Sequence, residues 1–530
     1  MSNNPYQDNT TGVTKNKLGI MDAAELRDQE YQLTRIRLLE LQFKPIAGNF
    51  DLDHLKAIHK HVFSDVYSWA GQEREINISK KSVTEPGYKT VFADKQDIAA
   101  RSKQAFEATP SKEVLRSLNA KQFSESMTDL YAKWNKAHPF PEGNGRALQA
   151  MLGQLARETG HELAFRRMPG DIFVDAAETS LPRQAINNPR DQRPADLDEL
   201  REIFEYITDP AKDATINLST IKLNEYADHD RALVQQAVAE AVKADPESFI
   251  DAYRRHEEAH GGRYVAADLF KETFAEYSAS NDSRNRYNNP VHNSAAVLSA
   301  ELFKQNLEEH RDSDKQVVFL TGTPGAGKTS FVLAGGEIQA DVAMVFEGQL
   351  SDPVTSIEKI QQVLDAGLVP AIRVVHVKPE FALANTLTRF EDKGRGASIN
   401  VMASIQGGLP DSLEQIRKQY GDAVELTVID KRLPKQLTIQ TGWQHVELLK
   451  SEGQNEHIKS ALSTALERRR SEGGLSDPAY KQAAGLPPVA RSTALLRAAT
   501  RGGEANEQRP GISGGNKSTN ILKTAASRER

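Results

Sequence analysis

The stretch that decides the fold of the first half of this chain is HPFPEGNGR, residues 138–146. Apolar side chains recur at the period of an α-helix on both sides of it. They are Met127, Leu130, Tyr131 and Trp134 before the stretch, and Leu148, Met151, Leu152 and Leu155 after it. The pattern predicts a compact loop that joins two amphipathic helices and ends at the N-terminus of the second helix.

The residue types in this loop suit phosphate chemistry. A helix N-terminus favours anions through its free N–H groups and the positive end of its dipole. Gly143 and Gly145 allow the backbone to approach an anion closely, and Arg146 can donate two N–H groups to a terminal phosphate. Glu142 is a hard oxygen ligand of the kind that Mg²⁺ takes. His138 has an ordinary pKa of about 6.5, which suits a general base at neutral pH.

A purely structural glycine-rich turn is the alternative. A base, a carboxylate, two glycines and an arginine within one short loop favour the catalytic interpretation. The stretch resembles the signature of the Fic family, His-Pro-Phe-x-Asp/Glu-Gly-Asn-Gly-Arg, at every fixed position. The resemblance covers roughly residues 20–205, including a helical pattern at 22–43 and the segment Val66-Tyr67-Ser68-Trp69-Ala70-Gly71.

The resemblance implies an all-helical core and transfer of AMP from ATP to a Ser, Thr or Tyr hydroxyl of a target protein. His138 would deprotonate that hydroxyl, Phe140 would anchor the loop in the core, and Glu142 would hold Mg²⁺ against the phosphates. Alternating residues near 75–79 and 90–92, with a Pro-Gly turn signal between them, predict a β-hairpin. It resembles the family flap, which aligns the target segment by strand addition; an irregular loop is the alternative.

The resemblance further implies that Gly143, Asn144 and Gly145 form the anion hole and that Arg146 contacts the distal phosphates. Many members carry a second arginine three residues later, where this chain has Gln149. Many also carry an inhibitory Ser/Thr-x-x-x-Glu-Gly/Asn helix, which is absent from this sequence. An inhibitor of this site would therefore be a separate small antitoxin protein.

A second motif, GTPGAGKT at residues 322–329, directly follows the apolar strand pattern Val317–Thr321. It is a P-loop, in which backbone N–H groups cradle phosphates, Lys328 bridges to the β/γ-oxygens of ATP or GTP and Thr329 ligates Mg²⁺. Its glycines are Gly322, Gly325 and Gly327. The alternative is a degenerate loop that binds nucleotide weakly.

Further strand patterns at 342–346, 371–377 and 426–429 alternate with helical stretches. They predict an α/β domain with a mostly parallel sheet. Residues 255–435 resemble the zeta-toxin kinases, which phosphorylate UDP-N-acetylglucosamine and related UDP-sugars. By that resemblance Val345-Phe346-Glu347-Gly348 is the second strand, and Arg389 and Arg395 are the two arginines that stabilise the transferred phosphate.

One segment departs from the zeta order. The family places its Asp-x-Asp-x-Phe-Lys base segment after the P-loop helix, whereas the similar string Ala267-Asp268-Leu269-Phe270-Lys271 precedes the P-loop here. A helical pattern at 291–303 follows it. We expect a rearranged order with a retained fold and Asp268 as the catalytic base. An exposed, helix-capping Asp is the alternative.

Length and composition set the frame for both domains. The chain has 530 residues, a net charge of −6 and no cysteine, which excludes disulfides, thiolate metal sites and cysteine nucleophiles. No apolar run is long enough to span a bilayer, so we expect a cytoplasmic protein with no membrane partner. The predicted divisions are a disordered leader at 1–15, the Fic domain at 16–208, a helical linker at 209–254, the zeta-like P-loop domain at 255–470 and a basic disordered tail at 471–530.

The end of the chain is basic, with nine Lys or Arg against three Glu in residues 481–530. Its composition predicts a segment that does not fold alone. A flexible end, a nucleic-acid contact and a recognition signal for type IV secretion machinery are the three interpretations. The sequence as a whole predicts a bacterial toxin or effector with two ATP sites, one for AMP transfer and one for a UDP-sugar kinase. In the alternative, the first domain transfers another nucleotide and the second is a nucleotide-binding scaffold.

Overall fold

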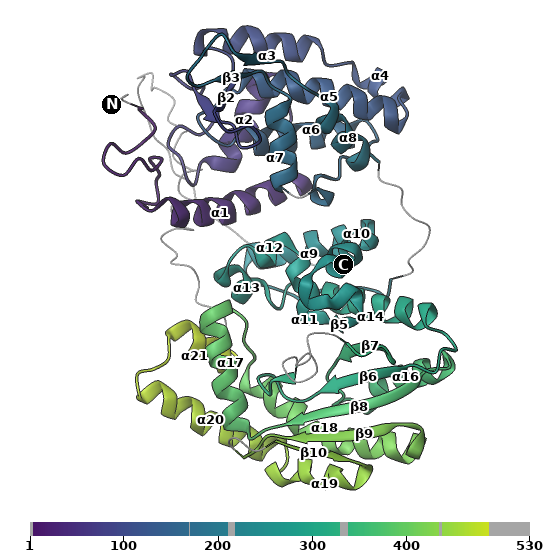
Figure 1. Ribbon diagram of the computed structural model, residues 1–530. Coiled ribbons are helices and arrows are strands. Elements are labelled where there is room, and N and C mark those ends of the chain that lie inside the picture. The colour runs from purple at the N-terminus through teal and green to yellow at the C-terminus, as the bar shows by residue number, and fades with distance from the viewer. Residues whose placement is uncertain (1–3, 169, 210–217, 329–337, 434–436, 487–530) are drawn as a thin grey trace, which may run out of the picture. The chain divides into compact units, whose positions relative to one another are not determined.

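The computed structural model describes residues 4–168, 170–209, 218–328, 338–433 and 437–486 (Figure 1). The first of its two units spans Met1–Pro488 and contains two hydrophobic cores. No helix within the described ranges combines the length and the apolarity that crossing a membrane requires.

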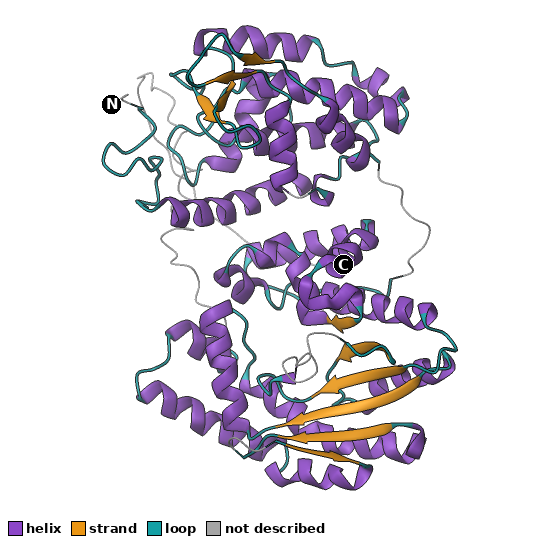
Figure 2. Ribbon diagram, viewed as in Figure 1, coloured by secondary structure: helices purple, strands orange, loops and turns teal. Residues whose placement is uncertain are grey.

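The N-terminal domain is almost entirely helical (Figure 2). Its central helices are α5 and α6, whose apolar faces were predicted around the 138–146 loop. The domain's helices are α1 (Ala23–Phe43), α2 (Leu52–Phe63), α3 (Ile98–Glu107), α4 (Lys112–Ser117), α5 (Ala120–Ala137), α6 (Asn144–Glu158), α7 (Gly170–Thr179) and α8 (Asp198–Ile207). Asn119 starts α5 with a reciprocal cap, because its side chain and that of Gln122 each accept the other's backbone N–H.

The predicted hairpin forms, but its first strand lies later than the sequence indicated. Strand β1 (Ser79–Lys81) pairs antiparallel with β2 (Tyr88–Val91), and Lys80 lies opposite Thr90. Two short strands that the sequence did not reveal, β3 (Arg183–Ala185) and β4 (Gln192–Arg193), extend the sheet in the order β1-β2-β3-β4. Strand β1 is therefore an edge strand.

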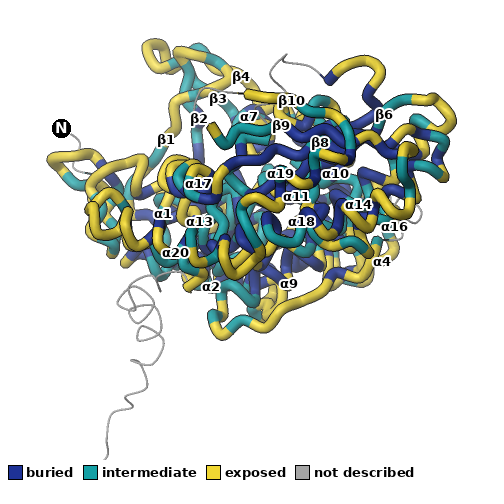
Figure 3. Tube along the Cα trace, turned by 90° about the horizontal axis from the view of Figure 1, so that it is seen from below, coloured by how far each residue is buried: buried dark blue, intermediate teal, exposed yellow. Residues whose placement is uncertain are grey.

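The second domain contains a six-stranded sheet in the order β10-β9-β8-β6-β7-β5, as Figure 1 shows. The strands are β5 (Tyr264–Ala266), β6 (Gln316–Thr321), β7 (Val342–Glu347), β8 (Val369–His376), β9 (Glu425–Asp430) and β10 (Thr438–Thr441). The pairs from β5 to β9 are parallel, and β10 is antiparallel to β9. The sequence predicted β6 to β9 because their continuous apolar runs suit strands that are buried on both faces (Figure 3).

Helices accompany this sheet throughout. They are α9 (His229–Ala244), α10 (Pro246–Arg255), α11 (Ala267–Phe270), α12 (Ala275–Ser278), α13 (Asn281–Tyr287), α14 (His292–Glu309), α16 (Pro353–Asp365), α17 (Pro379–Lys393), α18 (Ile399–Tyr420), α19 (Val446–Leu449), α20 (Asn455–Ser471) and α21 (Asp477–Ala483). Helix α14 contacts β5 and β7, and α16 contacts β8.

Helices of the predicted linker and of the predicted tail belong to the second domain. Val234 and Val242 of α9 and Tyr253 of α10 lie in the same apolar cluster as the sheet. Ala479 and Ala483 of α21 lie in it too, so ordered packing continues past residue 470. Alanine side chains on one helical face give little apolar signal in a Gly/Ala/Ser-rich composition. Residues 487–530 lie outside the described residues.

The described part of the predicted leader also packs. The Tyr6 ring meets Trp69 edge-on, with 5.7 Å between ring centres, and the Tyr6 hydroxyl accepts the backbone N–H of Glu75. Val13 is buried. A few apolar side chains thus fix a segment whose Asn/Thr-rich composition indicated disorder.

Candidate functional site

The 138–146 loop depends on two residues with left-handed backbone conformations. His138 ends α5 with φ 44° and ψ 60°, and Gly143 begins α6 with φ 82°. An added Cβ at Gly143 would overlap the Phe63 ring, so only glycine fits there. Nothing lies within 4 Å of an added Cβ at Gly145, which leaves the helix N-terminus open at that residue.

Asn144 closes the loop with its side chain. Its Oδ1 accepts the backbone N–H of Phe140 at 2.9 Å, and its Nδ2 donates to the Phe140 carbonyl at 2.8 Å. This pair holds the buried Phe140 ring in the core, as the sequence predicted for Phe140. The predicted anion-hole role of Asn144 falls to its backbone N–H, because the side chain is already bonded.

The two hydrogen bonds between Asn144 and Phe140 give a measurable prediction. Asn144→Ala removes both bonds and leaves the Phe140 backbone groups buried, so the N-terminal domain should lose about 2–4 kcal/mol of unfolding free energy. Chemical denaturation of the full chain, followed by tryptophan fluorescence, measures the loss. Asn188→Ala, in an exposed turn of the same domain, is the control and should change stability little. Equal free energies of unfolding for the two variants would contradict a stabilising role of these two hydrogen bonds.

His59 fixes the loop from the other side and was missed in the sequence. Its Nδ1 accepts the N–H of Gly71 at 2.9 Å, so its Nε2 donates to the Glu142 carbonyl, also at 2.9 Å. Its ring stacks on Phe140, with 3.8 Å between ring centres. Burial lowers the pKa of His59 to about 4, which keeps this tautomer neutral. His59 lies in helix α2, far from the motif in the sequence, and a single histidine there has no spacing that would indicate its role.

The His138 side chain is buried, and its ring stacks on Phe92 with 3.7 Å between ring centres. The Asn135 backbone lies within reach of the ring and favours its protonated form. The His138 carbonyl accepts Arg74 Nε at 2.8 Å, which fixes the backbone. Burial, followed by the charges of Lys80 and Arg74, lowers the pKa of His138 well below its ordinary value. The imidazole is therefore neutral at neutral pH and able to accept a proton.

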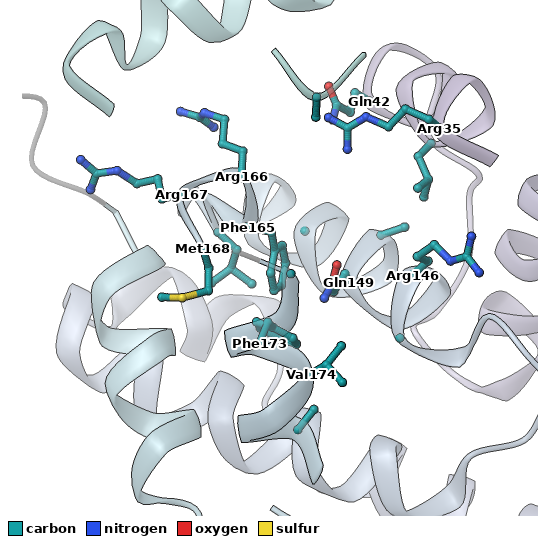
Figure 4. A pocket seen from close by; sticks show the side chains of 18 of the residues that line it. Arg35, Gln42, Arg146, Gln149, Phe165, Arg166, Arg167, Met168, Phe173 and Val174 are labelled. Atoms are coloured by element: carbon teal, nitrogen blue, oxygen red, sulfur yellow. The ribbon is translucent and has the colours of Figure 1, made fainter. Parts of the chain in front are cut away.

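Glu142 and Arg146, the charged residues of the motif, line the same pocket as His138. Figure 4 shows Arg146 and Gln149 at this pocket. Glu142 accepts the N–H of Gly143 through Oε1 at 3.0 Å, and its Oε2 has no hydrogen-bond partner within the described residues. Arg146 donates to Thr34 and Glu30, and Gln149 lies one turn further along α6. The structure thus brings together His138, Glu142, Gly143, Gly145 and Arg146 as predicted.

The flap borders this pocket. Lys80 and Lys81 of β1 line it together with Thr90 and Phe92. The turn between the strands is held by the Glu178 carboxylate of α7, which accepts the Val83 N–H at 2.9 Å and the Thr84 hydroxyl at 2.8 Å. The outer edge of β1 therefore lies beside the pocket that contains His138.

The P-loop of the second domain follows the central strand β6. Gly322, Gly325 and Gly327 all have φ between 78° and 136°. An added Cβ would overlap the Val375 carbonyl oxygen at the first position and the Ala382 carbonyl oxygen at the second. Conformation and close packing both require the first two glycines, and conformation requires the third, as in a loop whose N–H groups face a phosphate.

Lys328 lies over this loop. Its Nζ donates to the Gly322 carbonyl at 3.0 Å and lies 3.4 Å from Glu347 at the end of β7. Glu347 also accepts the Tyr264 hydroxyl of β5. One chain of contacts therefore links the P-loop to β5 across the carboxyl edge of the sheet. Thr329, the predicted Mg²⁺ ligand, lies outside the described residues.

Asp268 follows β5 at the same edge. Lys271 donates to its carboxylate at 2.8 Å, and Arg395 donates to its carbonyl at 3.3 Å. The Lys271 ammonium, with Arg389 and Arg395, holds the pKa of Asp268 well below its ordinary value. The structure thus groups Asp268 with both predicted arginines. Its ion pair makes it a weak base but a permanent hydrogen-bond acceptor.

No group of three or more His, Asp or Glu side chains suited to a metal occurs in the described ranges. His256 and His260, four residues apart, form no such group. A divalent ion at either predicted phosphate site would depend on one protein carboxylate or hydroxyl, with phosphate and water as its other ligands, which is usual for Mg²⁺.

The Fic/DOC family matches residues 49–156, which lie within the first domain. Protein adenylyltransferase VbhT of Bartonella schoenbuchensis is 41% identical over 167 residues, or 32% of this chain and 34% of VbhT. Probable protein adenylyltransferase y4lH of Sinorhizobium fredii is 31% identical over 167 residues, or 31% of this chain and 82% of y4lH.

A solved structure of BepC, a VirB-translocated effector of Bartonella tribocorum with bound AMPPNP, is 25% identical to this chain. The match covers 39% of this chain and 98% of that one, with a TM-score of 0.34. The chain spans about a third of the length of VbhT but most of y4lH. From the motif geometry, the family match and the extent of the y4lH match, this chain belongs to the Fic/DOC family.

Proposed function

We propose that the N-terminal domain transfers AMP from ATP to a Ser, Thr or Tyr hydroxyl of a target protein. The observation that carries the proposal is a neutral, buried His138 in one pocket with the open N-terminus of α6 and with Arg146. The relatives VbhT and y4lH are named a protein adenylyltransferase and a probable one, which supports this reaction class.

The chemistry follows from the residues. His138 accepts the proton of the target hydroxyl, whose oxygen forms a bond to the α-phosphorus of ATP. The bond from the α-phosphorus to the bridging oxygen breaks, and pyrophosphate leaves. The N–H groups at Gly143, Asn144 and Gly145 stabilise charge on the phosphates, and Arg146 binds the distal ones. Glu142 would hold Mg²⁺, because its carboxylate lies in the pocket and keeps one oxygen for a metal.

The edge strand β1 would align the target. Its outer backbone groups can pair with an extended segment of the substrate, and Lys80 and Lys81 border the pocket. Strand addition sets which hydroxyl reaches His138 and does not itself select the protein.

The nucleotide specificity is tested with lysate, Mg²⁺ and ATP, CTP, GTP or UTP, each labelled at the α-phosphate. We expect protein-bound label from ATP in the presence of the full chain. Label from another nucleotide and none from ATP would replace the proposal with its alternative, a different nucleotide transfer.

The pKa of His138 predicts the pH dependence of this reaction. Its base form is neutral, and its pKa in the folded protein is lowered, so kcat/KM should stay constant as the pH falls through 6.5 and decline only below that. Lys80 contributes to the lowering, so Lys80→Gln should move the decline to higher pH. Lys89→Gln, on the neighbouring strand, serves as the control. A decline centred above about 6.5 in the unmodified protein would contradict the neutral-base assignment.

We further propose that the second domain is a nucleotide-dependent kinase of the zeta type, with UDP-N-acetylglucosamine or a related UDP-sugar as its substrate. The favouring observation is the parallel order β5-β7-β6-β8-β9, in which the P-loop follows the central strand and Asp268 follows β5 at the same edge. Strand β5 precedes the P-loop in the chain yet occupies an edge position in the sheet. This supports a rearranged order with a retained fold, in which Arg389 and Arg395 stabilise the transferred phosphate and Thr329 ligates Mg²⁺.

Phosphate transfer from γ-labelled ATP to UDP-N-acetylglucosamine tests this second activity. We expect Lys328→Ala to reduce it at least about a hundredfold, because the lysine stabilises the charge of the transferred phosphate. Lys315→Ala, on the loop before β6, is the matched control and should keep the activity. Nucleotide binding without transfer to any UDP-sugar would instead favour the scaffold alternative.

The remaining partners are also proposals. A small antitoxin protein would inhibit the first site, and the basic C-terminal segment would address the chain to type IV secretion machinery. Before translocation the protein would reside in the cytoplasm. The secretion proposal predicts that removing residues 487–530 abolishes delivery into recipient cells while AMP transfer by the purified protein persists.

A further inference from the structure

The guanidinium of Arg146 is held on three sides by residues of α1 and α2. Its Nη1 donates to the Thr34 hydroxyl at 3.0 Å, and its Nη2 donates to the Glu30 carboxylate. Its central carbon lies 4.7 Å from the centre of the Phe63 ring. Neither Thr34 nor Glu30 belongs to the motif that contains Arg146, since both lie more than 100 residues earlier in the chain.

The two acceptors are themselves fixed. The Thr34 hydroxyl donates to the backbone carbonyl of Glu30 at 2.8 Å, which turns a lone pair toward Arg146. The second carboxylate oxygen of Glu30 accepts the Tyr67 hydroxyl. Burial and the Glu30 charge raise the pKa of Tyr67 far above its ordinary value, so this hydroxyl remains a donor. The Tyr67 ring stacks on Trp69 with 4.3 Å between ring centres.

The arrangement leaves donors for a ligand. A guanidinium has five N–H groups, and two of them form these bonds, so three remain. Arg146 is 28% exposed, whereas the Glu30 side chain is only 10% exposed. We propose that Glu30, Thr34 and Tyr67 are positioning residues that orient Arg146 so that its remaining N–H groups meet the distal phosphates of ATP. This inference rests on the proposed function of the first domain.

In the opposing interpretation Glu30 is an inhibitory residue: it occupies the place of a phosphate and must move away before ATP binds. The packing argues against it. Displacing Glu30 would strip a buried carboxylate of its guanidinium partner, a change that costs several kcal/mol. The carboxylate is also held by Tyr67 from the side away from Arg146. We therefore expect the Glu30–Arg146 pair to persist when nucleotide binds.

The test measures the affinities for ATP and for AMP separately. All measurements use the full chain with Lys328→Ala, which weakens the second nucleotide site. Thr34→Val removes one acceptor of Arg146 without changing charge. We expect ATP to bind about tenfold more weakly, as for the loss of one charge-assisted hydrogen bond, and AMP to bind unchanged because it has no distal phosphates. Thr34→Ser should restore the ATP affinity.

Thr128→Val is the matched control. Thr128 is buried on α5 and donates to the Ser124 carbonyl at 2.9 Å, the same bond to the preceding turn that Thr34 makes, but it does not contact Arg146. Tyr67→Phe is the second variant, for use if Thr34→Val folds poorly. It should also weaken the binding of ATP and leave the binding of AMP unchanged.

The possible outcomes distinguish failure of the positioning role from failure of the proposed function. ATP affinity that is unchanged or higher in Thr34→Val and Tyr67→Phe overturns the positioning role and favours an inhibitory role of Glu30. Equal losses for ATP and AMP also overturn it, because they indicate general damage to the pocket. If the Lys328→Ala parent binds neither ATP nor AMP, the proposed function itself fails.

Discussion

Replacing His138 with alanine should lower the rate of AMP transfer by about 10²- to 10⁴-fold, the usual contribution of a general base. The reason is the environment of this imidazole, which is buried and neutral and lies in the same pocket as Glu142 and Arg146. Transfer of α-phosphate label to protein measures the rate. Affinity for ATP should hardly change, because the proposed ligands of the phosphates are the N-terminus of α6 and Arg146.

His229→Ala controls for the removal of an imidazole, since the side chain of His229 is 76% exposed. It should keep full activity. If His138→Ala keeps more than about a tenth of the activity, then proton removal by His138 does not limit the reaction. A parallel loss of ATP binding would assign to His138 a structural role in the loop.

Replacing Gly143 with alanine should destabilise the N-terminal domain by about 2–5 kcal/mol and abolish AMP transfer. Two effects add. A left-handed backbone conformation costs a residue with a Cβ about 1–2 kcal/mol, and overlap with the buried Phe63 ring costs about 1–3 kcal/mol more. Chemical denaturation of the full chain, followed by tryptophan fluorescence, measures the loss.

Gly160 isolates the second effect. Its φ of 83° equals that of Gly143 within a degree, and nothing lies within 4 Å of an added Cβ. Gly160→Ala should therefore cost only about 1–2 kcal/mol. If both variants lose the same free energy, the close approach of Gly143 to Phe63 contributes nothing to the loop.

The sequence predicted those parts of the fold in which local pattern and tertiary packing agree. The apolar stripes of α5 and α6 and the continuous apolar strands β6 to β9 are such parts, because burial on one face or on both leaves a periodic signature. Strand β5 has only three residues, so no period was visible, although it completes the sheet edge that carries Asp268. Helix α21 was missed because its buried residues are alanines within a polar, glycine-rich context.

The residues of the candidate sites also differ in how well the sequence predicts them. His138, Glu142, Gly143 and Arg146 were predictable because one short loop contains them in a recognisable order. His59, Glu30 and Tyr67 were not, because their roles arise from contacts across 30 to 120 positions in the chain. Asn144 shows a mixed case: its importance was predicted, yet its side chain closes the loop and leaves only its backbone N–H for phosphate.

The most direct test of AMP transfer compares ATP labelled at the α-phosphate with ATP labelled at the γ-phosphate. The full chain, its Lys328→Ala variant and its His138→Ala variant are each incubated with Mg²⁺ and lysate. We expect α-label on protein with the first two chains, at least about a hundredfold less with His138→Ala, and no protein label from the γ-phosphate that depends on His138. Protein label from the γ-phosphate that requires His138, or α-label that stays above about a tenth in His138→Ala, would contradict AMP transfer by this site.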